Sequence, residues 1–278
     1  MQKTWFITGA SRGLGVQIAE AALRAGDRVI ATSRRREAVS ERLGPDSDQL
    51  LSLGLNVTEA DQARSAVEAG VARFGSIDVL VNNAGYGHLG FFEETTLEDV
   101  QAQFATNLFG VFNVTWAALP IMRSARHGLI FNISSLAGIL GAELTSLYSA
   151  TKFALEGFSE SLAKEIAPFG LFVTIVEPGP FRTDFLTPES LRFGDKSVAD
   201  YDERRPRVRA GFEQRNGRQP GDPARLAEAL VRLANEAAPP LRFAAGSLAV
   251  TLADAKLAGM QAEIARWRQL SLSTDYST

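Results

Sequence analysis

Short runs of apolar and β-branched residues alternate along the chain with longer stretches in which apolar residues recur every three or four positions. The short runs predict strands over residues 4–8, 28–33, 50–57, 78–82, 128–133, 172–176 and 241–244. The longer stretches predict helices over residues 13–25, 59–73, 97–124, 149–167 and 223–237. Strands that are apolar throughout and separated by helices are typical of a parallel sheet covered on both faces. We therefore expect one α/β domain, a doubly wound parallel sheet in three α/β/α layers.

Two of the predicted helices carry start signals. Asp222 followed by Pro223 is typical of an N-cap residue and a first-turn proline, and it predicts the start of the helix over 223–237. Thr58 with Asp61 three residues later is a variant of the capping box, and it predicts a side-chain cap at the start of the helix over 59–73.

Two segments depart from this alternation. Residues 184–221 have no clean period and are rich in arginine. An irregular segment of this length in a compact domain is typically a lid or binding segment, so we expect a substrate lid near 184–221. Residues 247–270 predict a C-terminal helical extension in which Leu257, Met260, Ile264 and Trp267 share one face.

Composition excludes several kinds of chemistry. The chain has 278 residues, no cysteine and only two histidines, His88 and His127, so thiolate chemistry and Cys-based or three-histidine metal sites are excluded and no metal site is predicted. The formal charge of −3 argues against a nucleic-acid partner. With no run near the ~20 apolar residues that span a bilayer and no signal-like N-terminus, we expect no membrane partner and a cytoplasmic location.

A glycine-rich turn follows the first predicted strand. Residues 8–15 read Thr-Gly-Ala-Ser-Arg-Gly-Leu-Gly and lead directly into an amphipathic helix. Glycines allow the backbone to approach a pyrophosphate, while the helix N-terminus offers unpaired N–H groups and the positive end of its dipole. The position of this turn between the first strand and the first helix predicts nucleotide binding in a Rossmann-type fold.

The residues after the second strand bear on the choice of cofactor. An acidic residue there would bind a ribose 2′-hydroxyl and favour NAD, whereas an arginine would bind a 2′-phosphate. The sequence has Ser33-Arg34-Arg35-Arg36 at this place, and Arg12 lies in the glycine turn. We therefore expect NADP(H) to be preferred over NAD(H), with a solvated basic helix start as the alternative interpretation of Arg34.

Tyr148 and Lys152 are separated by four positions on a predicted helix. Residues i and i+4 lie on one helix face, so the ammonium group can approach the phenol and lower its pKa from ~10 toward the range of a general acid or base. Ser135 lies thirteen residues before Tyr148, at the carboxyl end of a predicted strand, where ligands bind in open α/β sheets. Taken singly, these residues could also be an amphipathic helix pair and a turn residue.

Together these motifs resemble the short-chain dehydrogenase/reductase family, over residues 3–183 closely and more loosely beyond. The resemblance is carried by the glycine turn, Asn82-Asn83-Ala84-Gly85, Asn107, Ser135, the Tyr148 and Lys152 pair, and Pro178-Gly179-Pro180-Phe181-Arg182-Thr183, in order and spacing. Residues 82–87 and 177–185 are similar to those of the branch that includes 17β-hydroxysteroid and retinol dehydrogenases.

The resemblance implies a role for each motif. Tyr148 would be the general acid or base, Lys152 would lower its pKa and bind the nicotinamide ribose, Ser135 would bind the substrate oxygen, and Asn107 would hold a water of a proton relay. The resemblance implies that Tyr148 and Lys152 bind the cofactor as well. The other residues that it implies for cofactor binding are Gly9, Ser11, Arg12, Gly13, Leu14, Gly15, Ser33, Arg34, Asn56, Val57, Asn83, Ala84, Gly85, Pro178, Gly179 and Thr183.

Two features depart from the family's pattern. Asn56 stands where the family usually has an aspartate that contacts adenine. Many tetrameric members end in a glycine-rich strand closing with Asp-Gly-Gly, whereas this chain continues into a predicted helix. We therefore expect a homodimer rather than a tetramer, formed through the helices near 97–124 and 149–167.

The function expected from the resemblance is that of an NADP(H)-dependent oxidoreductase. It would transfer hydride between the nicotinamide and a carbonyl or secondary alcohol of a small-molecule substrate. Phe181, Phe185 and Leu186, beside the implied nicotinamide motif, favour an apolar substrate, and His88 could border the same pocket or be an ordinary loop histidine. The alternative is a non-catalytic NADP(H)-binding sensor on the same fold.

Overall fold

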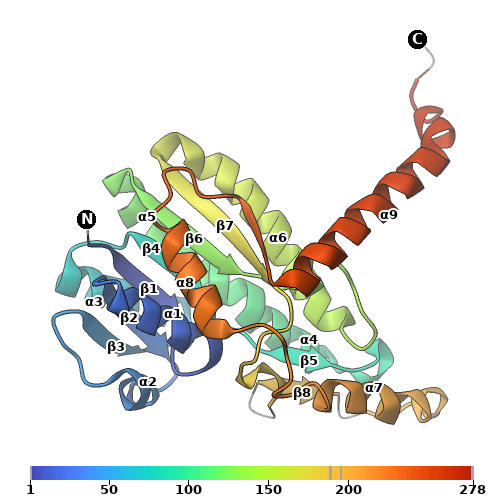
Figure 1. Cartoon of the computed structure of the whole chain (residues 1–278), viewed down its shortest axis with the longest axis horizontal. Helices are drawn as coiled ribbons and strands as arrows, with labels where there is room; N and C mark the ends of the chain where they lie inside the picture. Colours follow the sequence, from blue (N-terminus) through green and yellow to red (C-terminus); the bar gives the residue numbers. More distant parts are fainter. Residues whose placement is uncertain (1, 188–189, 195, 277–278) are drawn as a thin grey trace.

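The computed structural model describes residues 2–187, 190–194 and 196–276. Its centre is a seven-stranded sheet in the order β3-β2-β1-β4-β6-β7-β9, in which all neighbouring strands are parallel (Figure 1). The strands are β1 (Thr4–Thr8), β2 (Arg28–Ser33), β3 (Leu50–Gly54), β4 (Val79–Asn82), β6 (Gly128–Ile133), β7 (Leu171–Pro178) and β9 (Arg242–Ala245). This arrangement confirms the single-domain, three-layer α/β/α prediction.

Helices α1 (Gly13–Arg24), α2 (Arg36–Leu43) and α8 (Pro223–Leu233) cover one face of the sheet. Ile18 and Leu230 are fully buried there against apolar side chains of the central strands. Asp222 caps α8 by accepting a hydrogen bond from the N–H of Ala224 at 2.9 Å, as predicted. Helix α2 was not predicted, because Val39 is its only buried residue and its sequence therefore shows no apolar period.

Helices α3 (Ala60–Phe74), α5 (Gly110–Ala125) and α6 (Ser146–Ile166) cover the other face. The capping box predicted at Thr58 and Asp61 is wrong, because α3 begins after Glu59 and makes no side-chain cap. A complete capping box instead joins Thr96 and Asp99 at the start of α4 (Leu97–Phe104).

Some predicted boundaries also differ. The single helix predicted over 97–124 is α4, a π-helical turn (Ala105–Phe109) and α5. The strand predicted to reach Val57 ends at Gly54, and the N–H of Asn56 donates to the Gln62 side chain at 2.9 Å. Helix α6 begins at Ser146 rather than Ser149, so Tyr148 lies in its first turn.

The predicted lid is partly regular. Within 184–221, strand β8 (Leu191–Phe193) pairs in parallel with β5 (Gly87–Leu89), and helix α7 (Arg204–Glu213) follows. Positions 188, 189 and 195 of this segment lie outside the described residues. The ring of Tyr201 stacks on Phe91 with centroids 4.1 Å apart, and the guanidinium of Arg205 binds the buried carboxylate of Glu94. The segment is therefore anchored on the chain just after β5.

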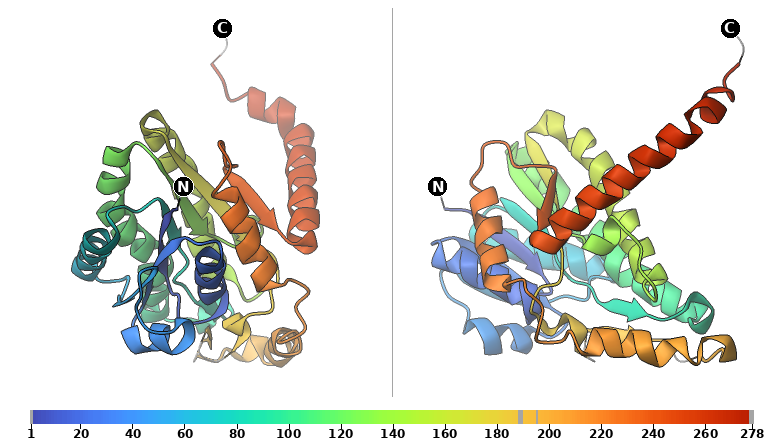
Figure 2. Two further views of the ribbon diagram at one scale, coloured as in Figure 1. Left: turned by 60° about the vertical axis from the view of Figure 1, so that its left-hand side comes forward. Right: turned by 45° about the vertical axis from the view of Figure 1, so that its right-hand side comes forward.

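The predicted C-terminal extension is α9 (Ser247–Leu272), which projects away from the edge of the sheet next to β9 (Figure 2). Its base is held by Ala249, which is fully buried. Every described residue from Asp254 onward is exposed.

The helical run Leu97–Ala125 is long and apolar enough, by length and composition, to cross a membrane. In this structure its second half, α5, lies on a sheet face with Val114, Ala118 and Met122 buried in the core. Phe109 and Trp116 on the run and Phe153 on α6 are exposed, at 52%, 70% and 46% respectively. Both the absence of a membrane partner and the dimer through these helices stay predictions.

The close approach of Gly15 to Gly9 gives a test of the turn that links β1 to α1. A Cβ on Gly15 would lie 2.3 Å from the Gly9 carbonyl oxygen, which is backbone and cannot rotate away. Gly15→Ala should therefore lower the free energy of unfolding by about 1–3 kcal/mol, measured by urea denaturation. Gly157→Ala is the matched control, since it lies in a helix with no atom within 4 Å and should be neutral or stabilising. An unchanged midpoint for Gly15→Ala would contradict this packing.

Candidate active site

The predicted site residues gather at the carboxyl ends of the central strands. The glycine turn follows β1, Asn83 follows β4, Ser135 follows β6 and Gly179 follows β7. Because all these strands are parallel, their carboxyl ends lie on one edge of the sheet. The strand order reverses between β1 and β4, and in open α/β sheets such a switch point is where ligands bind.

The glycine turn is built for close backbone contact. Gly9 and Gly13 have φ values of +68° and +56°, which favour glycine, and a Cβ on Gly9 would lie 3.0 Å from Ala84 Cα. Arg12 is the N-cap residue of α1 and makes no side-chain cap there. Since no side chain caps this helix N-terminus, its first N–H groups are oriented to receive an anion such as a pyrophosphate. Ser11 and Leu14 lie in the same turn and helix start.

Hydrogen bonds hold this turn against the end of β4. The hydroxyl of Thr8 accepts the N–H groups of Asn83 and Ala84, both at 3.0 Å. The side-chain amide of Asn83 donates back to the carbonyl oxygens of Thr8 and Gly9, at 2.9 and 3.1 Å. Asn83 and Ala84 therefore hold the backbone of the glycine turn against the end of β4. Gly85 lies next to them, and a Cβ there would be 3.1 Å from Asn107 Oδ1.

Ser33 and Arg34 lie at the end of β2, beside this turn. Ser33 is buried, and its hydroxyl donates to the Arg35 carbonyl at 2.6 Å. Arg34 is exposed at the surface. Asn56, two residues beyond β3, accepts the N–H of Thr58 at 3.3 Å through its side-chain oxygen. Val57 is buried, and its carbonyl accepts the side-chain amide of Asn113 at 2.9 Å.

Tyr148 and Lys152 share one buried face of α6. Both are less than a tenth exposed, and Lys152 Nζ lies 5.7 Å from the centre of the Tyr148 ring. The ammonium donates to the carbonyl oxygen of Ile133, the last residue of β6, at 2.8 Å. Tyr148 and Lys152 therefore lie close together, as predicted, although the ammonium donates its hydrogen bond to a backbone carbonyl rather than to the phenol.

The charges of this pair differ from the sequence expectation. Burial raises the pKa of the Tyr148 phenol to about 12, and the nearby Ser135 hydroxyl opposes this shift. Burial lowers the pKa of Lys152 to about 8, and the Glu156 carboxylate opposes that shift. The expected lowering of the tyrosine pKa by Lys152 is therefore not found in this arrangement, because desolvation of the phenolate is the larger effect.

Ser135 and Asn107 approach the pair from β6 and from the π-helical turn. Ser135 caps the short 3₁₀ turn Leu136–Gly138, its hydroxyl accepting the N–H of Ala137 at 3.1 Å. Asn107 is buried and binds both the N–H and the carbonyl of Tyr86, at 3.1 and 3.0 Å. It also donates to the Thr151 hydroxyl at 3.3 Å. Asn107 thus ties the turn after β4 to α6, and the π-helical turn sets its position.

The segment after β7 completes the site. The N–H of Gly179 donates to Ala245 at 3.0 Å, and a Cβ on Gly179 would lie 3.3 Å from the Ala249 nitrogen. Pro178 ends β7. Thr183 accepts the N–H of Phe185 at 3.3 Å, and its Cβ is the nearest atom to a Cβ placed on Gly13, at 3.8 Å. Two motifs 170 residues apart in the sequence numbering are therefore adjacent in space.

Sequence reasoning missed a group of carboxylates behind the pair. Glu156 and Glu160 continue the i+4 series of Tyr148 and Lys152, and Arg242 on β9 binds both of them and Glu177. Burial raises the pKa of Glu156 to about 7; Ser134 and Arg242 oppose this shift, and Glu177 reinforces it. The i+4 spacing could have indicated Glu156, but nothing in the sequence placed Arg242 beside it.

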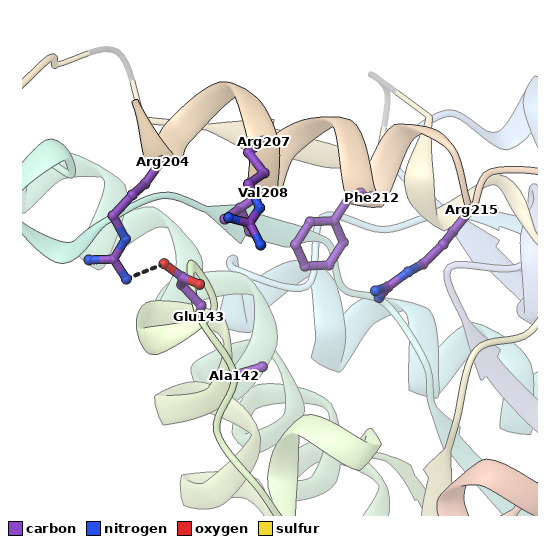
Figure 3. Close-up of a pocket in the computed structure, with 8 residues that line it drawn as sticks. Ala142, Glu143, Arg204, Arg207, Val208, Phe212 and Arg215 are labelled. Carbon is purple, nitrogen blue, oxygen red and sulfur yellow. Dashed lines mark hydrogen bonds and ion pairs between the residues drawn. The ribbon is translucent and has the colours of Figure 1, made fainter. Parts of the chain in front are cut away.

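A cavity of about 540 Å³ opens under α7 (Figure 3). Phe212 and Val208 form its apolar part, and they pack with Leu144 and Leu191 in one cluster. Arg207 and Arg215 line it from α7, while Arg204 pairs with Glu143 across it. The full lining is Ala142, Glu143, Arg204, Arg207, Val208, Gly211, Phe212 and Arg215.

The cavity is linked to the reactive pair through the lid. The ring of Phe185 lies 5.6 Å from that of Tyr148, and Leu186 packs in the cluster that includes Phe212. His88, which could have bordered this region, is instead buried on β5 with Nδ1 3.8 Å from an oxygen of Asp99. Within the described ranges no three His, Asp or Glu side chains are placed to hold a metal ion.

This arrangement can bind a phosphate group and exchange a proton. An uncapped helix N-terminus beside an open backbone turn can bind a dinucleotide phosphate. A buried phenol and ammonium next to a serine hydroxyl can exchange a proton with an oxygen on a bound molecule. A parallel sheet with this strand order and switch point has the topology of the Rossmann-type nucleotide-binding folds.

Comparison with known proteins places the chain within this class. The short chain dehydrogenase family profile matches residues 3–192, about two thirds of the chain. Oxidoreductase BOA17 of Botryotinia fuckeliana is 39% identical over 275 residues, 99% of this chain and 100% of that protein. A 3-ketodihydrosphingosine reductase of Bacteroides thetaiotaomicron is 39% identical over 248 residues, covering 88% of each chain. The chain therefore belongs to the short-chain dehydrogenase/reductase family, whose members here are oxidoreductases acting on CH-OH or carbonyl groups.

Solved structures agree. A short-chain dehydrogenase from Streptomyces avermitilis has a TM-score of 0.91 and 41% identity, over 99% of this chain and 100% of that one. ElxO with NADP bound has a TM-score of 0.69 and 28% identity, over 85% of this chain and 92% of that one. A 3-ketoacyl-(acyl-carrier-protein) reductase from Brucella melitensis, complexed with NADH, has a TM-score of 0.71 and 26% identity, over 84% and 90%. Similar proteins thus bind either nicotinamide cofactor.

The raised pKa of Glu156 predicts how stability depends on pH. Because the folded-state pKa of about 7 exceeds the ordinary value of 4.5, the folded chain holds a proton that the unfolded chain releases between these values. The stability contributed by this group is therefore complete below about pH 4.5 and is lost as pH rises through 7. Wild type should lose this stability as pH rises, whereas Glu156→Gln should not. The free energy of unfolding of Glu156→Gln minus that of wild type should therefore increase by about 1–3 kcal/mol from pH 5 to pH 8, measured by urea unfolding.

Glu160→Gln is the control for that experiment. It removes a carboxylate bound by the same Arg242, but from an exposed position. The difference between Glu156→Gln and Glu160→Gln should grow with pH. A difference that is constant from pH 5 to pH 8 would show that Glu156 does not hold a proton in this range.

Proposed function

We propose that the protein is an NADP(H)-dependent oxidoreductase that transfers hydride between the nicotinamide and a carbonyl or secondary alcohol, with Tyr148 as general acid or base. The observation that carries this proposal is the buried pair of Tyr148 and Lys152 on one face of α6, next to Ser135 at the end of β6. The family's oxidoreductase activity supplies the reaction class, and these residues supply its proton chemistry.

The electrostatics favour a proton donor. A phenol whose pKa is raised to about 12 is protonated at neutral pH, so Tyr148 can donate its proton to the oxygen of a carbonyl substrate. Lys152, with a pKa of about 8, is mainly cationic at pH 7 and would stabilise the phenolate that remains. Ser135 would orient the substrate oxygen, and Asn107 would hold the water of a proton relay. A bound nicotinamide would supply or accept the hydride.

We place the cofactor along the switch point. The N-terminus of α1 would receive the pyrophosphate. Gly13 and Thr183 would flank the pyrophosphate on the side that leads to the nicotinamide. Arg34, exposed at the end of β2, is positioned to bind a 2′-phosphate, and Arg12 lies in the neighbouring turn. The exposed arginine at this place supports a preference for NADP(H).

The substrate is proposed to be an apolar ketone or alcohol. Phe185 beside the Tyr148 ring would form the wall next to the reacting carbon, and the cluster of Leu186 and Phe212 leads from there to the cavity under α7. A cavity of about 540 Å³ is of the size that holds a drug-sized ligand. The bacterial relative named as a 3-ketodihydrosphingosine reductase supports a ketone with a long apolar chain.

Tyr148→Phe should abolish catalysis while leaving cofactor binding near that of the wild type. Removal of a general acid lowers turnover by about 10²–10⁴-fold, whereas the ring and its packing are kept. Turnover would be followed by NADPH absorbance with long-chain ketones, 3-oxoacyl esters, steroids, retinoids and aromatic ketones, and binding by NADPH fluorescence.

The matched control is Tyr276→Phe, because that tyrosine is fully exposed. Wild-type turnover in Tyr148→Phe would remove the tyrosine from the mechanism. Tight NADPH binding by the wild type with no turnover of any carbonyl compound would instead favour the non-catalytic sensor.

Arg34→Ala should weaken NADPH binding far more than NADH binding. Loss of a charge-assisted hydrogen bond to the 2′-phosphate corresponds to about a 10–100-fold increase in the NADPH Kd, since NADH lacks that phosphate. Titration calorimetry with both cofactors measures the ratio. Arg42→Ala, an exposed arginine at the end of α2, is the control, and equal losses for both cofactors would refute the assignment.

A further inference from the structure

Helix α9 leaves the body of the protein with an apolar stripe exposed. Leu257, Met260, Ile264 and Trp267 are between 46% and 61% exposed, and Val250 near the base is 47% exposed. The helix projects from the sheet edge in Figure 1 and in the right-hand view of Figure 2. Most of the stability of a helix in a protein comes from packing its apolar face, and among the described residues Trp267 and Ile264 remain more than half exposed.

The stripe has the spacing of a coiled coil. Val250, Ala253, Leu257, Met260, Ile264 and Trp267 are separated alternately by three and four residues, which places them at successive a and d positions of a heptad. Such a seam faces another helix rather than a sheet or a lipid surface. With Asp254 and Glu263 against Lys256, Arg266 and Arg268, the helix also lacks the strongly basic face of a membrane-surface helix.

We propose that α9 is a dimerisation arm, which pairs antiparallel with α9 of a second copy of this chain. In the register that sets Leu257 against Met260 of the second copy, small side chains meet large ones along the seam. Ala253 then faces Ile264 and Val250 faces Trp267, and the twofold symmetry repeats each pair. A parallel pair would instead set Trp267 against Trp267 and leave Ala253 against Ala253, which fills the space poorly.

Charges beside the seam agree with the same register. In an antiparallel pair the g positions flank one another, so Lys256 of one copy lies opposite Glu263 of the other, and this ion pair occurs twice. Asp254 lies opposite the neutral Gln261. Self-complementary charges of this kind fit a second copy of the same helix better than an unrelated partner.

The area is also adequate for a specific contact. Burying an aliphatic side chain of this kind removes roughly 60–120 Å² from water, so five large stripe side chains from each copy give about 600–1,200 Å². With the flanking residues this reaches the lower end of the range for stable interfaces, about 1,200 Å². The contact is distinct from the exposed aromatic side chains of α5 and α6.

Charge reversal tests the proposed pairing directly. Lys256→Glu should raise the dissociation constant of the α9 contact about tenfold, since it sets two glutamates opposite one another, and Glu263→Lys should do the same. The double variant Lys256→Glu/Glu263→Lys should restore the wild-type association. Light scattering and sedimentation of the whole protein measure the mass relative to the 30.0 kDa of one chain. Failure of the double variant to restore the mass would contradict the antiparallel register.

A second variant tests the apolar seam. Leu257→Glu/Ile264→Glu should weaken the contact at least a hundredfold, so the mass falls by half, whether from two chains to one or from four to two. Leu272→Glu is the control, because this leucine is exposed but lies off the stripe. An unchanged mass for the seam variant, or a wild-type chain that is already monomeric, would overturn the proposal. Far-UV circular dichroism reports whether the variants keep their helix.

The absence of cysteine allows the geometry to be checked by crosslinking. Leu257→Cys and Met260→Cys are made as separate single variants. The proposed register predicts an interchain disulfide when the two proteins are mixed and oxidised, and little when either is oxidised alone. A disulfide formed by Leu257→Cys alone would indicate a parallel pair and contradict the antiparallel one.

Discussion

The junction between β1 and β4 is the constraint on which the site depends. At this point the strand order reverses, and the Thr8 hydroxyl accepts two backbone N–H groups while Asn83 donates back to two carbonyls. These bonds fix the backbone of Gly9 within van der Waals distance of Ala84 and leave no room for a side chain. Since Gly15 in turn packs on the Gly9 carbonyl, the start of α1 is set by the same bonds, and so is the direction in which its N–H groups point.

A second constraint acts along α6. One face of this helix carries Tyr148, Lys152, Glu156 and Glu160 at intervals of one turn, and the first three of these side chains are buried together in a desolvated environment. Burial alone would favour neutral forms of all of them. Arg242, from the edge strand β9, supplies a cation that offsets the carboxylates of Glu156 and Glu177. The last strand of the sheet therefore contributes to the charge of the site as well as to the fold.

The sequence predicted the central sheet and the turn after β1, because apolar runs and glycine-rich turns follow from local backbone and side-chain preferences. The seven strands of the central sheet and the turn at Gly9 followed from period and spacing, whereas β5 and β8 were not predicted. The pairing of Tyr148 with Lys152 followed from helix geometry, and the role of Ser135 beside them came from the resemblance to the family. The error at Thr58 has a local origin, because the N–H of Thr58 bonds the side-chain oxygen of Asn56 and α3 begins after Glu59 without a side-chain cap. Other errors arose where the deciding contact is distant in sequence. No spacing rule could show that burial would outweigh Lys152 in setting the pKa of Tyr148, because that depends on how completely the site is closed.

Helix α9 is another element whose contacts the sequence does not determine. Its residues share a face, as the sequence predicted, but a sequence cannot say whether that face meets the body or leaves it. Among the described residues of α9, Ala249 at the base is fully buried, and it lies against Gly179 of the segment that would hold the nicotinamide. A partner bound along α9 would therefore lie on a helix whose base contacts the segment that follows β7.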